Sequence, residues 1–357
     1  SVMDAPERRA KGAHYTSEAN IMKVIGPLFL DDLRAEFERI RARRTGREAA
    51  LRQFQKKLAG LTFIDPACGC GNFLVVAYRE LRALELATLE EIYPRELTGT
   101  GDMARQAFTD LGLLAMVNVG QFYGIEFEEF PARIAEVAMW MADHLANNDL
   151  SAAFSTNFAR IPLKVSAHIR HGDALEIGWN KVLPANQCSY IMGNPPFIGH
   201  QWRNSTQQAG MHRVWGQQGQ VNRLDYVTAW FKLAAEYAQN NSAVEIAFVS
   251  TNSICQGEQA GILWPHLTAL GIKIRFAHRT FVWSNEASGQ AAVHCVIVGM
   301  QTKEPSSRVI FDYPYPKGEC VAIKAKAING YLIDAPFVTL PARTSPPPGL
   351  PKMTKGS

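Results

Sequence analysis

Residues 61–73 read LTFIDPACGCGNF, a short apolar run that ends in an acidic residue and a glycine-containing loop. Residues 72–85, NFLVVAYRELRALE, follow with apolar side chains at helical spacing. This order is typical of a β-strand, a tight loop and an α-helix, the unit from which doubly wound α/β sheets are built. Such sheets bind ligands at the carboxyl ends of their strands, so this loop is the first candidate site.

The alternation of strand and helix continues along the chain. Strand-like apolar runs lie at 121–125, 188–192, 244–250, 272–277 and 292–300, and helical patterns lie at 131–146, 225–239 and 258–269. Alternating elements predict a mostly parallel sheet with helices on both faces. Because Ala277 and Ala292 are too close in sequence for a comfortable helical crossover, we expect the last two strands to be antiparallel, with one reversed strand near the sheet edge.

Composition places the chain among ordinary globular proteins, since 47% of its 357 residues are hydrophobic and 20% are charged. No run of about 18 apolar residues indicates a membrane span. No secretory signal opens the chain and its six cysteines are scattered, so we expect a cytoplasmic protein. Cys68 and Cys70 form a C-x-C pair without a second pair at metal spacing, and we therefore predict no metal site.

The net charge of +4 is weak evidence for a polyanionic partner, but basic residues gather near the N-terminus. They are Arg39, Arg41, Arg43, Arg44, Arg47, Arg52, Lys56 and Lys57. On a helix this cluster could follow a phosphate backbone. The alternative is an ordinary solvated helix face, and the residues do not decide between the two.

The glycine loop has the properties of a cofactor cradle. Gly69 and Gly71 let the backbone approach a ligand closely, and the helix that begins at Asn72 favours an anionic group at its N-terminus. The spacing is neither G-x-G-x-x-G nor a P-loop, so both a dinucleotide and ATP are disfavoured. The candidate cofactor-binding residues here are Asp65, Pro66, Ala67, Gly69 and Gly71.

Two more acidic residues follow later strands. Glu126 ends the second strand in YGIEF (123–127), where a carboxylate binds ribose hydroxyls. Asp173 ends a third strand in HGDAL (171–175), where it could accept from an adenine amino group. Asp65 and Glu126 lie 61 residues apart, whereas a compact unit separates loop and acid by about 20 residues. Residues 88–118 are therefore predicted to be an insertion.

Residues 191–200, IMGNPPFIGH, present an apolar strand that runs into an amide, two prolines and an aromatic ring. Consecutive prolines cannot continue a central strand, because they donate no hydrogen bond to the ladder. Together with residues 65–73, this motif resembles the S-adenosylmethionine-dependent amino-methyltransferases. An upstream stretch, AHYTSEANI at 13–21, resembles the extra cofactor motif of that family, and the motif order resembles the gamma class of DNA adenine methyltransferases.

Five stretches more narrowly resemble the methyltransferase region of MmeI-like restriction–modification enzymes of types IIL and IIG. They are HYTSEANI (14–21), DPACGCGNFLVVAYREL (65–81), YGIEFEEFPARIAEVAMW (123–140), GNPPFIGHQW (193–202) and FVWSNEASGQAAVHCVIVG (281–299). The resemblance, which covers about residues 10–335, implies a Rossmann-like class I methyltransferase fold, S-adenosylmethionine as cofactor, and methyl transfer to adenine N6 in double-stranded DNA.

The resemblance also implies a domain plan. We expect residues 1–60 to form a helical segment with the upstream cofactor motif, residues 61–335 to form the catalytic domain, and residues 336–357 to be a linker. A target-recognition domain would follow, and the parent polypeptide would also carry an endonuclease domain. No Lys of this chain has Asp or Glu two residues before it, so we expect no nuclease activity from these residues.

The chemistry of amino-group methylation explains the unusual strand end. Asn194 and the carbonyl of Pro195 can accept both N–H groups of an aromatic amine, which frees its lone pair, while Pro195 and Pro196 hold the acceptors in place. Phe197 can stack on a base that has been flipped out of the duplex. By resemblance, Trp283 or Phe281 supplies the opposite stacking face, with Trp283 favoured.

The resemblance assigns two further cofactor contacts. Thr16 would contact the methionine carboxylate and Phe73 would lie near the cofactor. Three other activities stay open on the residues alone: transfer to guanine amines in RNA, transfer to protein glutamine, and a non-catalytic DNA-binding module. Cytosine N4 presents an amine similar to adenine N6, so the residues leave the target base open, and adenine is what the resemblance implies.

Overall fold

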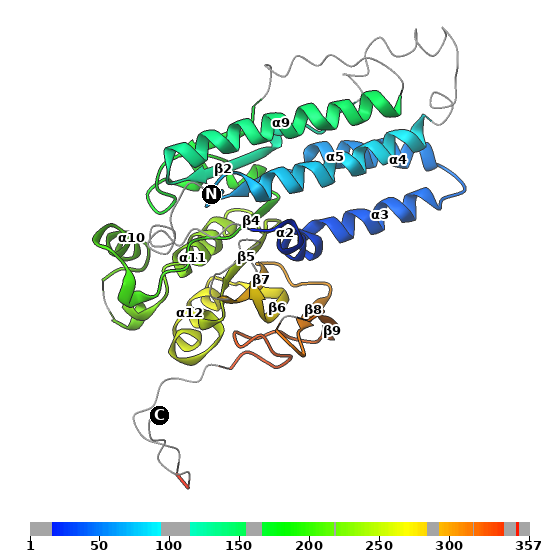
Figure 1. The fold of residues 1–357 in the computed structure, drawn as a ribbon. Helices are drawn as coiled ribbons and strands as arrows, with labels where there is room; N and C mark the ends of the chain where they lie inside the picture. Colours follow the sequence, from blue (N-terminus) through cyan, green and yellow to red (C-terminus); the bar gives the residue numbers. More distant parts are fainter. Residues whose placement is uncertain are drawn as a thin grey trace.

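A nine-stranded sheet forms the centre of the computed structural model, and helices cover both of its faces (Figure 1). The structure describes residues 16–93, 115–154, 166–217, 219–283, 293–316, 318–338 and 348–349. The strands are β1 (Phe63–Asp65), β2 (Phe122–Glu126), β3 (His168–His171), β4 (Tyr190–Gly193), β5 (Glu245–Thr251), β6 (Lys273–Trp283), β7 (Val293–Gln301), β8 (Arg308–Asp312) and β9 (Val321–Ala325). Their order is β3-β2-β1-β4-β5-β7-β6-β8-β9.

The predicted parallel core is confirmed, because β3, β2, β1, β4 and β5 are all parallel neighbours. The antiparallel pairing of β6 with β7 is also confirmed. However, the reversed strand β7 lies inside the sheet, between β5 and β6, and not near its edge. The sequence-based prediction lacked β8 and β9, which continue the sheet beyond β6 and end it on the antiparallel strand β9.

The described helices are α2 (Glu18–Ile25), α3 (Asp31–Arg41), α4 (Arg47–Gly60), α5 (Asn72–Ile92), α9 (Glu129–Ala153), α10 (Ser205–Trp215), α11 (Thr228–Ala238) and α12 (Gly257–Ala269). A π-helical turn, Gly26–Leu30, joins α2 to α3, and Gly46, with φ +63°, precedes α4. The insertion predicted at 88–118 begins within α5, and residues 94–114 lie outside the described residues. None of the described helices has the length and hydrophobicity needed to cross a bilayer.

Alternating side chains of the central strands divide the core into two layers. Phe63 of β1 packs in one cluster with α2–α5 and α9, whereas Ile64 packs in the other with α11 and α12. On β5, Ile246 and Phe248 likewise face α11 and α12. A strand points successive side chains to opposite faces, so both layers are apolar and both need helices.

A buried polar network holds α5, α9 and the segment before β2 together. The guanidinium of Arg82, 5% exposed, donates to the Val117 carbonyl at 2.9 Å and to Asn147 Oδ1 at 3.0 Å. Glu85, one turn later on α5, accepts from the backbone N–H groups of Met116 (2.6 Å) and Val117 (3.0 Å). Because buried charges are stable only with partners, this network determines how the chain enters β2.

Candidate active site

Three parallel strands bring the predicted motifs to one edge of the sheet. β1 lies between β2 and β4, so the chain that leaves β1 at Asp65 lies beside the chain that leaves β4 at Gly193. Glu126 is the last residue of β2 on the other side. Parallel neighbours end at the same edge, and this edge is where an open α/β sheet binds its ligand.

Asp65 carries an incomplete set of hydrogen bonds. Its side chain is 1% exposed, and Oδ1 accepts from the backbone N–H of Ala67 at 3.0 Å. Oδ2 is buried and has no hydrogen-bond partner among the described residues. Burial raises the pKa of Asp65 to about 8; the bond from Ala67 lowers this pKa and nearby Glu126 raises it. A buried, unsatisfied carboxylate oxygen at a strand end indicates a position that a ligand donor fills.

The glycine loop adopts the conformation that its sequence predicts. Gly69 and Gly71 have φ values of +55° and +86°, in the left-handed region that glycine tolerates. A Cβ on Gly71 would also stand 3.1 Å from the Cβ of Ala135 on α9, so a larger residue here would be crowded as well as strained. The N–H of Gly69 donates to Glu126 Oε2 at 2.9 Å and thereby joins the loop to the end of β2.

The other two acidic residues lie on the same edge. Glu126 is half-buried, and its Oε1 accepts from the N–H of Glu128 at 3.0 Å. Asp173 follows β3 through Gly172, whose N–H donates to the Glu126 carbonyl at 2.8 Å. Burial raises the pKa of both carboxyl groups. The three predicted carboxylates therefore stand at three adjacent strand ends.

Sequence reasoning missed two residues that support this loop. The indole N–H of Trp230, on α11, donates to the Pro66 carbonyl at 3.0 Å and anchors the loop from the opposite layer. Gly124 of β2 leaves room for Cys68, because a Cβ at residue 124 would stand 2.8 Å from the Cys68 Sγ. A glycine within a strand indicates that another part of the chain or a ligand approaches closely, so the role of Gly124 could have been predicted from the sequence. Nothing in the sequence indicated the role of Trp230.

The end of β4 places the amide of Asn194 against the upstream motif. Asn194 Nδ2 donates to Thr16 Oγ1 at 3.1 Å, across 178 residues of chain. Asn194 Oδ1 is buried and accepts no hydrogen bond from the described residues. Pro195 is buried, Pro196 is half-buried, and Phe197 packs against both core layers. The predicted cofactor motif and the predicted catalytic motif therefore meet.

The predicted aromatic residues lie in the layer formed by α2–α5 and α9. Phe73 is buried in the first turn of α5. Phe281 and Trp283, 1% and 3% exposed, end β6 and belong to the cluster against which Phe197 packs. The Phe281 ring stacks on Tyr313 at 5.1 Å, whereas the Trp283 indole N–H has no hydrogen-bond partner in the described part of the chain. Their assignment to a stacking face stays a prediction.

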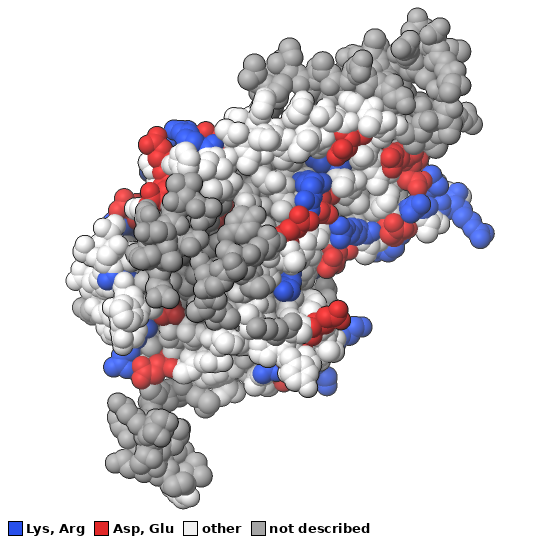
Figure 2. Space-filling model, in the orientation of Figure 1, with Lys and Arg blue, Asp and Glu red and all other residues white. Residues whose placement is uncertain are grey.

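The basic cluster lies away from this edge. Arg41 and Arg47 pair with Glu91 at 2.7 and 2.6 Å, at the last turn of α5. Since α5 has 21 residues, that turn is about 30 Å from the glycine loop. Figure 2 shows basic and acidic side chains interleaved over this part of the surface.

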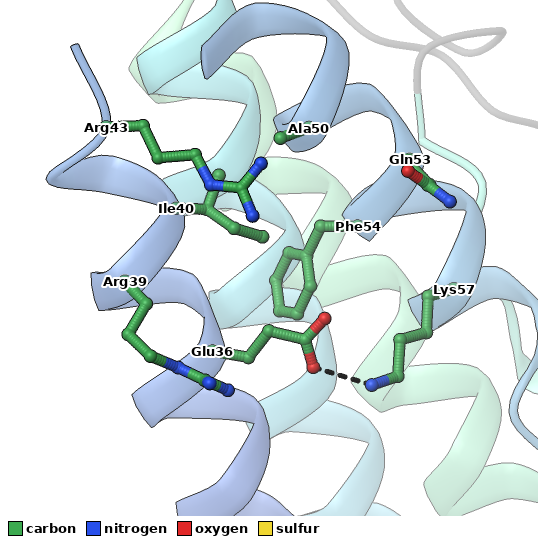
Figure 3. Close-up of a pocket in the computed structure, with 8 residues that line it drawn as sticks. All are labelled: Glu36, Arg39, Ile40, Arg43, Ala50, Gln53, Phe54 and Lys57. Atoms are coloured by element: carbon green, nitrogen blue, oxygen red, sulfur yellow. Dashed lines mark hydrogen bonds and ion pairs between the residues drawn. The ribbon is translucent and has the colours of Figure 1, made fainter. Parts of the chain in front are cut away.

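Between α3 and α4 the surface forms a hollow of about 620 Å³, lined by Glu36, Arg39, Ile40, Arg43, Ala50, Gln53, Phe54 and Lys57 (Figure 3). Lys57 pairs with Glu36 across it at 2.6 Å. No acidic partner of Arg39 or Arg43 occurs among the described residues. Arg41, Arg47 and Lys57 are thus engaged in ion pairs on the surface, and the contact of the basic cluster with a phosphate backbone stays a prediction.

The arrangement of the strand ends can be compared with known families. A family model described as the MmeI DNA-methyltransferase domain matches residues 41–312, which include both the glycine loop and the Asn194 motif. The chain belongs to this family. The resemblance seen in the sequence is therefore confirmed, and with it the Rossmann-like methyltransferase fold.

Two relatives of this chain extend the comparison. The chain is 36% identical over 360 residues to DNA methyltransferase A of Bacillus subtilis (strain 168), a match that covers 100% of this chain and 38% of that protein. It is 52% identical to the type IIL restriction–modification enzyme MmeI, solved in complex with DNA, with a TM-score of 0.89 over 97% of this chain and 44% of that chain. This chain thus spans less than half the length of either relative.

Proposed function

We propose that this domain transfers a methyl group from S-adenosylmethionine to adenine N6 in double-stranded DNA, as the modification part of a restriction–modification system. The observation that carries the proposal is a pair of buried acceptors that have no partner among the described residues. Asn194 Oδ1 directly follows β4, and Asp65 Oδ2 ends the adjacent strand β1. One acceptor suits a substrate amine and the other suits a cofactor ammonium. Membership of the MmeI methyltransferase family supports this pairing.

The residues present fit S-adenosylmethionine. Asp65 Oδ2 offers an acceptor to an ammonium group, and the left-handed glycines at 69 and 71 open the backbone beside it. Glu126 and Asp173 offer carboxylates on the same edge for ribose hydroxyls and an adenine amino group. The remaining proposed contacts are Pro66, Ala67 and Phe73; Thr16, which the resemblance also assigns to the cofactor, contacts Asn194 in the structure. When bound, the cofactor supplies an activated methyl sulfonium.

The Asn194 motif would prepare the substrate amine. The lone pair of an aromatic amine is delocalised into its ring, so the amine is a weak nucleophile. Asn194 Oδ1 and the Pro195 carbonyl would accept its two N–H groups and draw it towards a tetrahedral geometry. Pro195 and Pro196 restrict the backbone, so little reorganisation is needed. No strong base is required, because the proton becomes acidic only after the transfer.

A base within a duplex cannot reach this edge, so the target must be flipped out. Phe197 would stack on one face of the base, and Trp283, or Phe281 in its place, would stack on the other. Both relatives are more than twice as long as this chain. We infer that a target-recognition domain and an endonuclease domain accompany it in one polypeptide.

The test is to express the reading frame that encodes this chain in a host without DNA methylation and to sequence the native genomic DNA for modified bases. N6-methyladenine at one short recurring sequence would establish the reaction, the product and the specificity together. N4-methylcytosine would correct the product while keeping the reaction class. An unmodified genome would contradict the proposal, and labelled methyl transfer to RNA and protein would then be measured.

A further inference from the structure

We propose that Thr16 is a positioning residue: its hydroxyl holds the Asn194 amide in the orientation that turns Oδ1 towards the substrate amine. This inference rests on the proposed function, because it assigns Asn194 Oδ1 to the substrate. It gives Thr16 a different role from the cofactor-carboxylate contact that the family resemblance implies.

The contact that carries this inference is specific. Asn194 Nδ2 donates to Thr16 Oγ1 at 3.1 Å, and Thr16 is itself buried, with 5% of its surface exposed. The other end of the amide, Oδ1, is buried and has no partner within the described residues. A buried Oδ1 without a partner, next to an Nδ2 that already donates to Thr16, is ready to accept a hydrogen bond.

The orientation of this amide decides whether it helps or hinders the reaction. The terminal torsion of an Asn side chain has two broad wells, related by a rotation that exchanges O and N. In one well Asn194 presents a carbonyl to the substrate amine; in the other it presents an NH₂ group, and two donors then face each other. The neighbouring prolines restrict the backbone but leave this torsion free, so a separate contact must select the well.

Thr16 can make that selection because of its place in the fold. It precedes α2, whereas Asn194 follows β4, and only the packing of α2 against the sheet brings the two together. A hydroxyl has one donor and two acceptor sites, so the direction of the bond matters. If Thr16 instead donated to Oδ1, it would occupy the acceptor that the substrate needs. The proposal therefore requires Thr16 to accept.

The first measurement needs no substrate. The protein would be labelled with ¹⁵N only at asparagine, and the Asn194 side-chain NH₂ signals would be identified by their loss in Asn194→Ala. We expect these protons to exchange with solvent at least about 10-fold more slowly in the wild type than in Thr16→Val, with Thr16→Ser close to the wild type. Thr16→Val preserves the shape of the side chain, and its thermal unfolding would confirm folding. Equal exchange in the wild type and Thr16→Val would overturn the proposal.

The second measurement separates the positioning role from a cofactor contact. Thr16→Val should lower kcat at least about 10-fold while the Kd for S-adenosylmethionine stays within about twofold, and Thr16→Ser should restore kcat. A Kd raised at least about 10-fold with kcat unchanged at saturating cofactor would make Thr16 a cofactor ligand and would overturn the positioning role. If the wild type methylates no DNA, the proposed function fails, whereas the exchange measurement still decides the orientation of the amide.

Discussion

Gly193 and Asp65 fit together so closely that a Cβ on Gly193 would stand 2.5 Å from Asp65 Oδ1. The two residues end adjacent parallel strands, β4 and β1, and belong to different motifs of the sequence. No real side chain approaches a carboxylate at that distance, so glycine is required here for Asp65 to occupy its position. The glycine before Asn194 thus serves the proposed cofactor site rather than the amine site.

Gly193→Ala is therefore expected to displace the Asp65 carboxylate. Because a charge-assisted hydrogen bond would be lost, affinity for S-adenosylmethionine should fall about 10-fold or more in isothermal titration calorimetry. Gly60→Ala is the matched control, since a Cβ at this last residue of α4 meets nothing within 4 Å. Unchanged affinity in Gly193→Ala would show that Asp65 does not hold the cofactor.

Replacing Asn194 should separate turnover from cofactor binding. Asn194→Ala removes the unpartnered side-chain carbonyl, so methyl transfer should fall by about 10²-fold or more, as when a preorganised polar group is removed from other active sites. The Kd for S-adenosylmethionine should stay within about twofold of the wild type. Asn148→Ala, at an exposed position on α9, controls for loss of an amide. A parallel loss of binding and turnover would mean that the site is misassigned.

Phe197→Ala tests the proposed stacking face. Stacking of a base on an aromatic side chain contributes about 1–3 kcal/mol, so affinity for substrate DNA should weaken by that amount while cofactor affinity is kept. Trp283→Ala and Phe281→Ala, measured beside it, should show which ring supplies the other face. We expect the larger loss from Trp283. Unchanged rate and DNA affinity in Phe197→Ala would remove this ring from the base pocket.

The raised pKa of Asp65 predicts a pH dependence of stability in the cofactor-free protein. Burial raises this pKa to about 8, against about 3.9 in an unfolded chain. The native state therefore holds the proton more tightly, and the free energy of unfolding should decline as the pH rises from about 4 to about 8. Asp65→Asn keeps a neutral group and should remove this decline.

Urea denaturation at several pH values would measure the effect. The free energy of unfolding of Asp65→Asn should be higher than that of the wild type by on the order of 2–4 kcal/mol at about pH 8. The difference should be much smaller at about pH 5. The other buried carboxyl groups, among them Glu126, are common to both proteins and cancel in the difference. Parallel pH curves for the two proteins would contradict the proposed burial of the Asp65 charge.

The buried network around Arg82 should be costly to break. The Arg82 guanidinium lies 3.7 Å from the carboxylate of Glu85 and also faces that of Asp143. Arg82→Met leaves both carboxylates without their cation, so the free energy of unfolding should fall by about 3–5 kcal/mol. Arg133→Met is the control: Arg133 is 59% exposed and pairs with Glu136 on the surface, and the loss should be at most about 1 kcal/mol. Similar losses from both variants would argue against a structural role for the network.

The central strands could be predicted because their side chains are buried on both faces and form continuous apolar runs. β1, β2, β4 and β5 all coincide with such runs. β9 could not be predicted in this way, since it reads VAIKA at the sheet edge with four of its five residues exposed. The place of β7 between β5 and β6 depends on how the chain connects its strands, which a local pattern does not show, although the continuous apolar run of β7 is itself typical of an interior strand.

The strand–loop–helix unit and the strand-end acidic residues could be predicted from the sequence, because each depends on residues that are close together along the chain. The family resemblance could be predicted too, because each of its motifs is a continuous stretch. The contact of Thr16 with Asn194, the space that Gly193 leaves for Asp65, and the bond from Trp230 to Pro66 became visible only in the folded chain. These contacts join residues more than 100 positions apart, and they depend on the order of the strands and the packing of helices across them. Local periodicity shows which face of an element is buried, but it does not show which other element buries it.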